Sequence, residues 1–225
     1  MEIRENLERL KKEIPGHVTL VAVSKTHPAE TVMEAYNAGQ RIFGENKAQE
    51  MIAKQSLLPG DIQWHFIGHL QRNKVKFIAP FVGMIESVDS LRLLKEINKE
   101  AGKAGRIIPV LLQFHIASEE TKFGLDMDEA RQLLNAPEYR EMKHINLRGV
   151  MGMASLTDDE TLIRKEFSYL RSIFEELRKD YFSSNPEFSQ ISMGMSGDYA
   201  IAIEEGSTMV RIGTGIFGER EYGQL

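Results

Sequence analysis

The 225-residue sequence contains no cysteine. This absence excludes disulfide frameworks, thiolate nucleophiles and zinc sites built on cysteine. The sequence also lacks an excess of positive charge, because 28 lysines and arginines stand against 33 aspartates and glutamates, a formal net charge of −5. A dedicated nucleic-acid-binding protein usually carries a basic excess, so we expect no nucleic-acid partner.

Long apolar runs are missing as well. The longest apolar-leaning stretches, such as residues 107–112, fall far short of the roughly 20 residues that a membrane-spanning helix needs. The N-terminal stretch alternates charges and contains no apolar core of a signal peptide. We therefore expect no membrane association and a cytoplasmic location.

What the sequence does contain is a regular alternation of two patterns. Short apolar runs, rich in β-branched residues, alternate with longer segments of helical periodicity. The runs are apolar on both faces, which is typical of parallel strands covered by helices. The predicted strands are Val18–Lys25, Arg41–Glu45, Trp64–Gly68, Met84–Asp89, Pro109–Ile116, Leu147–Met153, Gln190–Gly197 and Val210–Phe217.

Helices are predicted in the segments between these strands and before the first one. Eight strand–helix units in this length average about 28 residues each, a fair length for one repeat of a closed barrel. We predict an α/β protein with one (β/α)8 barrel, residues 1–225 forming a single domain with an extra N-terminal helix; a doubly wound sheet is the alternative. The predicted helices cover residues 2–13, 28–38, 45–55, 90–103, 126–135, 158–180 and 198–206.

The active site of such a barrel lies at the carboxyl ends of its strands. Lys25 follows the apolar run VTLVAV at the end of the first strand. Partial desolvation there favours the neutral amine that a Schiff base requires. The alternative is a lysine that caps a strand or pairs with a carboxylate.

Two turns of small residues follow the seventh and eighth strands, where such barrels commonly bind phosphate. Ser196 and Thr214 would supply hydroxyls, while Gly197 and Gly213 would let the backbone approach the anion. The helix that begins near Asp198 would direct its positive end toward the same place. The alternative is two ordinary glycine-containing turns.

Arg211 lies among apolar residues of the eighth strand, and a buried arginine needs a partner. It either forms a structural ion pair or faces the ring nitrogen of pyridoxal phosphate (PLP), a role that arginine takes in PLP proteins. Barrel closure makes the first and eighth strands neighbours, which brings Lys25 close to Arg211. A lysine, a phosphate cradle and an arginine are the three parts of a PLP site.

Five motifs in order carry a resemblance to a known family. The sequence resembles the YggS/PROSC family of PLP homeostasis proteins, which are relatives of the alanine racemase barrel, and the likeness spans residues 18–222. The motifs are AVSKTHP (22–28), FGENKAQE (43–50), WHFIGHLQRNK (64–74), SMGMSGDY (192–199) and STMVRIGTGIFGER (207–220).

The resemblance implies a barrel like the alanine racemase N-terminal domain, without the C-terminal β domain of the racemases. It implies further that Lys25 carries PLP as an aldimine and that Arg211 faces the pyridine nitrogen. The remaining implied cofactor-binding residues are Asn46 beside the ring or its 3-hydroxyl, Ser196, Gly213 and Thr214 on the phosphate, and Met193, Gly194 and Gly197 along the cradle. The region of Ile67 and His69 resembles a wall of the same mouth.

The function implied by the resemblance is PLP homeostasis: storage, buffering or delivery of PLP through a reversible Schiff base, without catalytic turnover. Expected partners are PLP and PLP-dependent apo-enzymes, and we expect a monomer, because the racemase dimer uses the missing domain. One alternative is a PLP-dependent amino-acid racemase of low activity, although no second acid/base is apparent. The other is a cofactor-free Schiff-base aldolase in which Arg211 binds a substrate phosphate or carboxylate.

Two further patterns carry no function. Residues 213–218 match GxGxxG, but they open no βαβ unit of the kind that binds a dinucleotide. His65 and His69 are four residues apart, yet they straddle the end of a strand. We expect structural or pocket-wall roles for them and no metal site.

Overall fold

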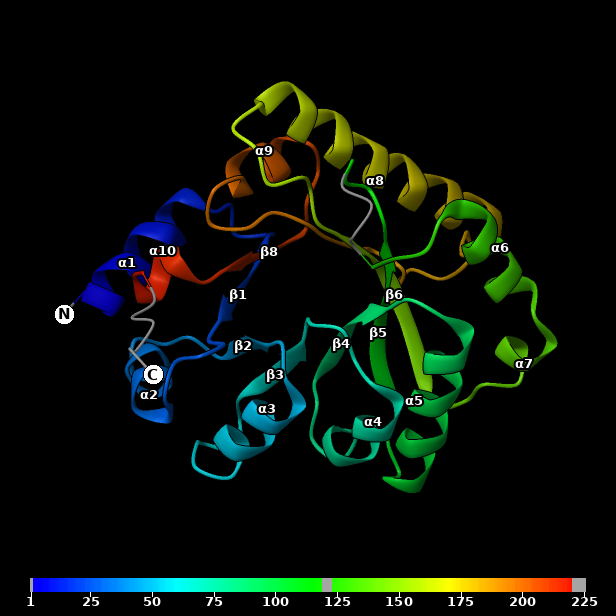
Figure 1. The fold of residues 1–225 in the computed structure, drawn as a ribbon, viewed down its shortest axis with the longest axis horizontal. Coiled ribbons are helices and arrows are strands. Elements are labelled where there is room, and N and C mark those ends of the chain that lie inside the picture. The colour runs from blue at the N-terminus through cyan, green and yellow to red at the C-terminus, as the bar shows by residue number, and fades with distance from the viewer. Residues whose placement is uncertain (1, 119–122, 220–225) are drawn as a thin grey trace.

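The computed structural model describes residues 2–118 and 123–219. Eight parallel strands pair in sequence order and close into a barrel, which confirms the predicted fold class and excludes the doubly wound sheet (Figure 1). The strands are β1 (Thr19–Val23), β2 (Ile42–Glu45), β3 (Gln63–Phe66), β4 (Met84–Val88), β5 (Ile108–Phe114), β6 (Ile145–Gly152), β7 (Gln190–Ser192) and β8 (Met209–Ile212).

Helices surround the barrel, and one of them precedes the first strand as predicted (Figure 1). The longest, α8, starts at a side-chain cap from Asp159 and buries an apolar stripe that includes Phe167 and Leu170. The helices are α1 (Glu2–Glu13), α2 (Ala29–Asn37), α3 (Ala48–Gln55), α4 (Arg72–Ile78), α5 (Leu91–Lys103), α6 (Met127–Asn135), α7 (Pro137–Arg140), α8 (Glu160–Tyr181), α9 (Tyr199–Glu204) and α10 (Thr214–Phe217). None of these helices is long and apolar enough to cross a bilayer.

The ladder between β1 and β8 closes the barrel. Its register places Thr19 opposite Met209 and Val21 opposite Arg211. Lys25 follows β1 by two residues and Arg211 lies in β8, so the pairing of these strands brings together two residues that 186 positions separate in the chain. The prediction that barrel closure brings these strands together is confirmed.

Successive residues along each strand lie in two different buried environments. Residues such as Ala22 and Val210 belong to the large apolar core that the helices cover. Their neighbours on the opposite face of the strands form a separate small cluster inside the barrel. This interior layer consists of Val21, Met84, Leu111, Met151 and Met209.

The structure corrects the predicted elements in several places, since β1 ends at Val23 rather than Lys25 and the short helix α7 is not predicted. Helix α4 is not predicted, because its seven residues begin without a side-chain cap and carry three basic side chains. The predicted last strand stops at Ile212, and residues 214–217 form the short helix α10. The seventh strand is only three residues long, so the turn with Ser196 lies in the loop between β7 and α9.

Candidate functional site

A cavity of about 270 Å³ opens at the carboxyl ends of the strands. It contains seven of the nine predicted site residues, and these come from the segments that follow β1, β2 and β7 and from β8 with the turn after it. The lining residues are Val23, Lys25, Asn46, Ile67, Met153, Leu156, Met195, Ser196, Gly197, Arg211, Gly213 and Thr214.

Lys25 reaches this cavity because of the pleat of β1. Val21 faces the barrel interior and Val23 lines the cavity, so the next residue on the same face is Lys25. The side chain is half-buried. The strand therefore places a primary amine inside a largely apolar wall, as predicted for a Schiff-base lysine.

Near the other end of the sequence, the turns that follow β7 and β8 form a cradle of backbone N–H groups. The Ser196 hydroxyl accepts hydrogen bonds from the N–H groups of Gly213 and Gly215, both at 3.3 Å. The bonds are long, and the Ser196 hydroxyl keeps its own hydrogen for another acceptor. A Cβ added to Gly213 would lie 3.2 Å from the carbonyl oxygen of Val23, so glycine lets β1 and this turn approach closely. The cradle thus offers the Ser196 hydroxyl to an anion, and an anion that took the place of this hydroxyl would meet the N–H groups of Gly213 and Gly215 as well.

The start of the cradle is held by Asp198 and by tight backbone packing. Oδ1 of Asp198 accepts a hydrogen bond from the N–H of Met195 at 2.5 Å. Gly194 adopts a φ of +98°, and a Cβ there would lie 2.6 Å from the Cβ of Ala202 in α9. Only glycine fits this approach without displacing the helix. Gly194 therefore fixes the turn between β7 and α9 without itself lining the cavity.

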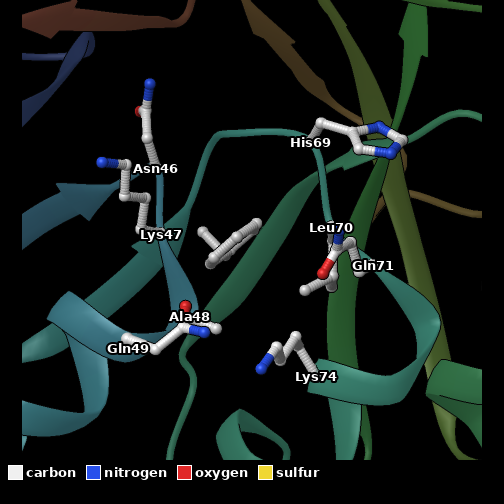
Figure 2. Close-up of a pocket in the computed structure, with 9 residues that line it drawn as sticks. Asn46, Lys47, Ala48, Gln49, His69, Leu70, Gln71 and Lys74 are labelled. Carbon is white, nitrogen blue, oxygen red and sulfur yellow. The ribbon is translucent and has the colours of Figure 1, made fainter.

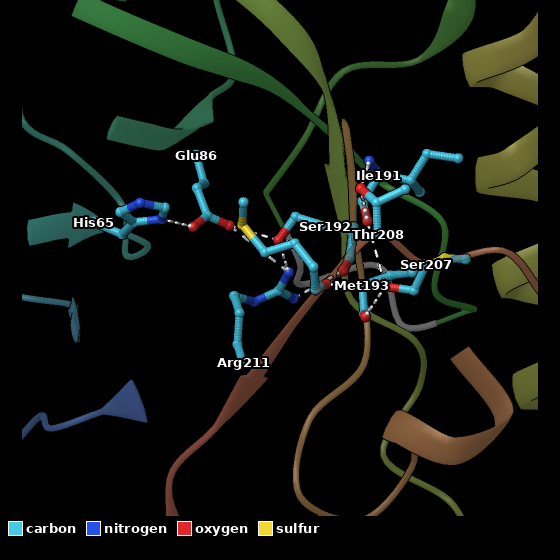
Figure 3. A network of polar contacts seen from close by, with 10 residues as sticks. His65, Glu86, Ile191, Ser192, Met193, Ser207, Thr208 and Arg211 are labelled. Atoms are coloured by element: carbon cyan, nitrogen blue, oxygen red, sulfur yellow. Dashed lines mark hydrogen bonds and ion pairs between the residues drawn. The ribbon is translucent and has the colours of Figure 1, made fainter. Parts of the chain in front are cut away.

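Arg211 lines the cavity and is 4% exposed. Its Nη1 donates to the Ser192 hydroxyl at 2.6 Å, and its Nη2 donates to the carbonyl oxygen of Gly152 at 2.9 Å. The Ser192 hydroxyl donates in turn to Oε2 of Glu86 at 2.5 Å, while Nδ1 of His65 lies 2.7 Å from Oε1 (Figure 3). We call His65, Glu86, Ser192 and Arg211 the polar chain.

The polar chain determines the ionisation of Glu86, which is completely buried. Burial alone would raise the pKa of this carboxyl group. The hydrogen bond and charge of His65, the charge of Arg211 and the Ser192 hydroxyl outweigh burial and hold the pKa of Glu86 below its ordinary value. Since an ionised carboxylate only accepts hydrogen bonds, His65 donates through Nδ1.

A second buried polar group lies behind Lys25, between the barrel and α3. The Glu45 Oε1 accepts hydrogen bonds from the Ser24 hydroxyl at 2.7 Å and from Lys54 Nζ at 2.6 Å. Glu50, at the start of α3, accepts the N–H of Thr26 at 2.8 Å and lies 3.7 Å from Lys54 Nζ. We call these five residues the outer cluster, and it holds the turn that carries Lys25.

Asn46 lies between this cavity and a neighbouring pocket of about 230 Å³ (Figure 2). Its Oδ1 is buried and has no hydrogen-bond partner among the described residues. His69 lines the neighbouring pocket rather than the main cavity, stacks on Phe123 and lies 3.4 Å from Asp89, whereas Ile67 lines the main cavity. The two residues expected to share one wall therefore belong to two pockets.

The neighbouring pocket is built by the motifs FGENKAQE and WHFIGHLQRNK. Lys74 extends from α4 toward the beginning of α3 (Figure 2). The described residues contain no group of three or more histidines, aspartates or glutamates arranged to hold a metal ion.

The comparisons with known proteins agree with this geometry. The family model "Alanine racemase, N-terminal domain" matches residues 1–221. A protein of Aquifex aeolicus named Pyridoxal phosphate homeostasis protein is 40% identical over 96% of this chain and 96% of its own length.

The chain belongs to the family of pyridoxal phosphate homeostasis proteins.

Among solved structures of the family, PipY of Synechococcus elongatus with PLP bound is 37% identical, with a TM-score of 0.85, covering 96% of this chain and 100% of that one. Alanine racemase of Clostridium difficile is 15% identical, with a TM-score of 0.75, and the match covers 99% of this chain and 57% of the racemase. The second likeness shows the fold alone. Membership in the family confirms the resemblance that the five motifs indicate.

Met193, like Gly194, is a predicted site residue that does not line the cavity. Its side chain is fully buried in the large core that the helices cover. Its N–H donates to the carbonyl oxygen of Met209, and its own carbonyl accepts from Ser207. The pleat explains this position, because Ser192 faces the barrel interior and the next residue faces outward. The methionines that line the cavity are Met153 and Met195.

The sequence alone does not identify the residues that support the cavity without lining it. Glu86, Ser192 and Lys54 carry no predicted role, and His65 is predicted only as a structural or wall residue. The available signal is the occurrence of charged residues inside short apolar strands, since a buried carboxylate requires a partner.

Proposed function

We propose that the chain binds PLP in the main cavity through a reversible Schiff base on Lys25 and serves in PLP homeostasis by storing, buffering or delivering it. The observation that carries this proposal is the single cavity that joins a lysine amine, a cradle of N–H and hydroxyl donors and a buried arginine. These groups come from the two ends of the chain and meet only because the barrel closes. The close relatives named for PLP homeostasis and the PLP-bound PipY structure support the same reading.

The residues present fit PLP on an observation independent of the relatives. The buried Oδ1 of Asn46 lines the cavity without a partner, and a ligand with a hydroxyl group would supply the missing donor. PLP carries such a hydroxyl together with a phosphate, a ring nitrogen and an aldehyde. When bound, PLP supplies an aldehyde carbon that condenses with an amine, releasing water.

Each chain residue has a distinct role in this proposal. Lys25 is the amine that bonds the aldehyde carbon. Ser196, Gly197, Gly213 and Thr214 hold the phosphate through hydroxyl and backbone N–H groups. Arg211 donates to the ring nitrogen and Asn46 accepts from the ring hydroxyl.

The described lining residues support a carrier rather than a racemase. A racemase needs an acid/base on each face of the reacting carbon. Lys25 would serve one face, and Arg211 does not release its proton in proteins. Without a second proton donor, binding and release remain the reactions that the site supports. We propose delivery to PLP-dependent apo-enzymes, a monomer as the working form, a cytoplasmic location and one PLP-binding domain across residues 1–225.

The test is the absorption spectrum after PLP is added and excess PLP is removed, with and without borohydride reduction. Lys25→Ala is compared with wild type and with Lys47→Ala, which removes a mostly exposed lysine at the edge of the neighbouring pocket. We expect a visible band in wild type and Lys47→Ala, fixed by borohydride as added mass on Lys25, and no band in Lys25→Ala. Borohydride-fixed PLP on another residue in Lys25→Ala, at the level of wild type, would refute the site.

The same preparations separate carrier from enzyme. Wild type loaded with PLP is mixed with a PLP-dependent apo-enzyme, whose recovered activity reports transfer. It is also incubated with L-alanine, and the formation of D-alanine is followed. Transfer without racemisation supports the carrier, whereas turnover that Lys25→Ala abolishes supports the racemase. Absence of any band in wild type would favour the cofactor-free aldolase.

A further inference from the structure

We infer that Glu86 is a positioning residue for the cofactor: acting through Ser192, it fixes the guanidinium of Arg211 as the hydrogen-bond donor to the ring nitrogen of PLP. This inference rests on the proposed function and assigns a role to residues that do not line the cavity themselves. Figure 3 shows the polar chain that carries it, running from β3 through β4 and β7 to β8.

The direction of every hydrogen bond in the polar chain is determined by chemistry. A guanidinium only donates, so the Ser192 hydroxyl accepts from Arg211 at 2.6 Å. The hydroxyl hydrogen is then directed to Glu86 at 2.5 Å, because an ionised carboxylate only accepts. One hydroxyl therefore links the arginine and the carboxylate in a single orientation.

The guanidinium is also anchored on its other side. Nη2 donates to the carbonyl oxygen of Gly152 at 2.9 Å. These two bonds engage two of the five N–H donors of an arginine, and the same side chain lines the cavity, where a further donor would meet a ligand. Because the anchors lie on β6 and β7, the guanidinium is held at two points of the barrel wall.

Charge gives Glu86 a second effect on Arg211. The side chains of Arg211 and Glu86 are 3% and 0% exposed, and Nη1 lies 4.0 Å from Oε2. Burial lowers the pKa of Arg211, and the negative charges of Glu86 and Asp198 oppose this shift. Glu86 thus stabilises the charged guanidinium where water does not.

The ring nitrogen is the PLP group that this guanidinium would meet. Lys25 takes the aldehyde carbon, and the turns after β7 and β8 take the phosphate. Of the described residues that line the cavity, Arg211 is the buried one with a permanent positive charge. A fixed cationic donor keeps the ring nitrogen unprotonated, so Glu86 sets the electronic state of the bound PLP from outside the cavity.

The test compares PLP with an analogue that carries a C–H group in place of the ring nitrogen. Dissociation constants and absorption spectra are measured for wild type, Glu86→Gln, Arg211→Gln and the double variant. Glu86→Gln removes the negative charge beside Arg211, and its single amide oxygen cannot accept from both His65 and Ser192 as the carboxylate does. We expect Glu86→Gln to weaken PLP binding about tenfold, the loss of one good hydrogen bond, and to leave analogue binding unchanged. In the Arg211→Gln background, Glu86→Gln should have no further effect.

Ser192→Ala is the second variant, because it removes the link and retains both charged residues. It should shift PLP affinity and spectrum in the same direction as Glu86→Gln. Glu100→Gln is the matched control, since Glu100 lies on α5 and pairs with Lys103 away from the cavity. Equal weakening of PLP and the analogue, additive effects with Arg211→Gln, or an unchanged PLP affinity in both Glu86→Gln and Ser192→Ala would overturn the inference. Failure of wild type to bind PLP at Lys25 would instead overturn the proposed function.

Discussion

Two buried glutamates lie close to the cavity and behave in opposite ways. Glu86 in β4 and Glu45 in β2 are both completely buried. The pKa of Glu86 lies below the ordinary glutamate value, because its hydrogen bonds and neighbouring positive charges outweigh burial. The pKa of Glu45 lies above it, because burial outweighs Lys54 and Ser24. Equal burial therefore gives opposite shifts.

The difference lies in how the carboxylate oxygens are occupied. Both oxygens of Glu86 accept hydrogen bonds, one from His65 and one from Ser192. In Glu45 the hydrogen bonds from Ser24 and Lys54 converge on Oε1, and Oε2 has no partner among the described residues. A buried acceptor left unsatisfied favours the protonated acid. The comparison teaches that the direction of the pKa shift of a buried carboxyl group depends on whether hydrogen bonds to both of its oxygens and nearby charges outweigh burial.

The largest expected effect comes from removing the better-satisfied carboxylate. Glu86→Ala should destabilise the protein by about 3–5 kcal/mol, because it leaves the buried Arg211 without its ion-pair partner. Glu45→Ala should cost less, about 1–3 kcal/mol, because Lys54 keeps Glu50 at 3.7 Å. Urea unfolding at neutral pH measures both free energies. Equal losses, or a larger loss in Glu45→Ala, would break the comparison.

A smaller effect distinguishes the two glutamates by pH. A lowered folded-state pKa adds stability that is present above the unfolded value of 4.5 and is lost as pH falls through the folded pKa. A raised folded-state pKa acts in the opposite way, so stability falls as pH rises from 4.5 through the folded pKa of Glu45. Each pKa unit corresponds to about 1.4 kcal/mol.

The measurement is the free energy of unfolding of wild type, Glu86→Gln and Glu45→Gln across the acidic range. The advantage of wild type over Glu86→Gln should grow as pH rises toward 4.5. The advantage of wild type over Glu45→Gln should shrink as pH rises above 4.5. Slopes of the same sign in the two pairs would contradict the opposite directions of the two pKa shifts.

The sequence predicts the barrel and most of the cavity because both depend on local patterns. Eight apolar runs predict eight strands, and closure then places Lys25 near Arg211 whatever the details of the register. The cradle is predictable because small residues such as Ser196 and Gly213 occur in turns that follow strands. These features need only the order of the elements, and order is what a sequence displays.

The polar chain and the outer cluster depend instead on which face of a strand a residue occupies. Glu45 and Glu86 look alike in the sequence, each being a charged residue in a short apolar strand. Since these strands are apolar on both faces, no alternation shows that Glu86 points into the barrel and Glu45 points toward α3. Met193 is misplaced for the same reason, one position out of phase with Ser192.

The smallest expected effect concerns the backbone that the outer cluster holds. Thr26 adopts a φ of +68°, the one left-handed non-glycine residue of the described chain, and its N–H donates to Glu50 at 2.8 Å. Thr26→Gly should stabilise the protein by up to about 1 kcal/mol. The strain energy that glycine removes at this left-handed position exceeds the free-energy cost of the more flexible unfolded chain. Ser56→Gly is the control, since Ser56 has an ordinary φ of −72° and should lose stability. Thermal unfolding measures both. A loss in Thr26→Gly equal to that of the control would mean that the threonine side chain, and not Glu50, holds the Lys25 turn.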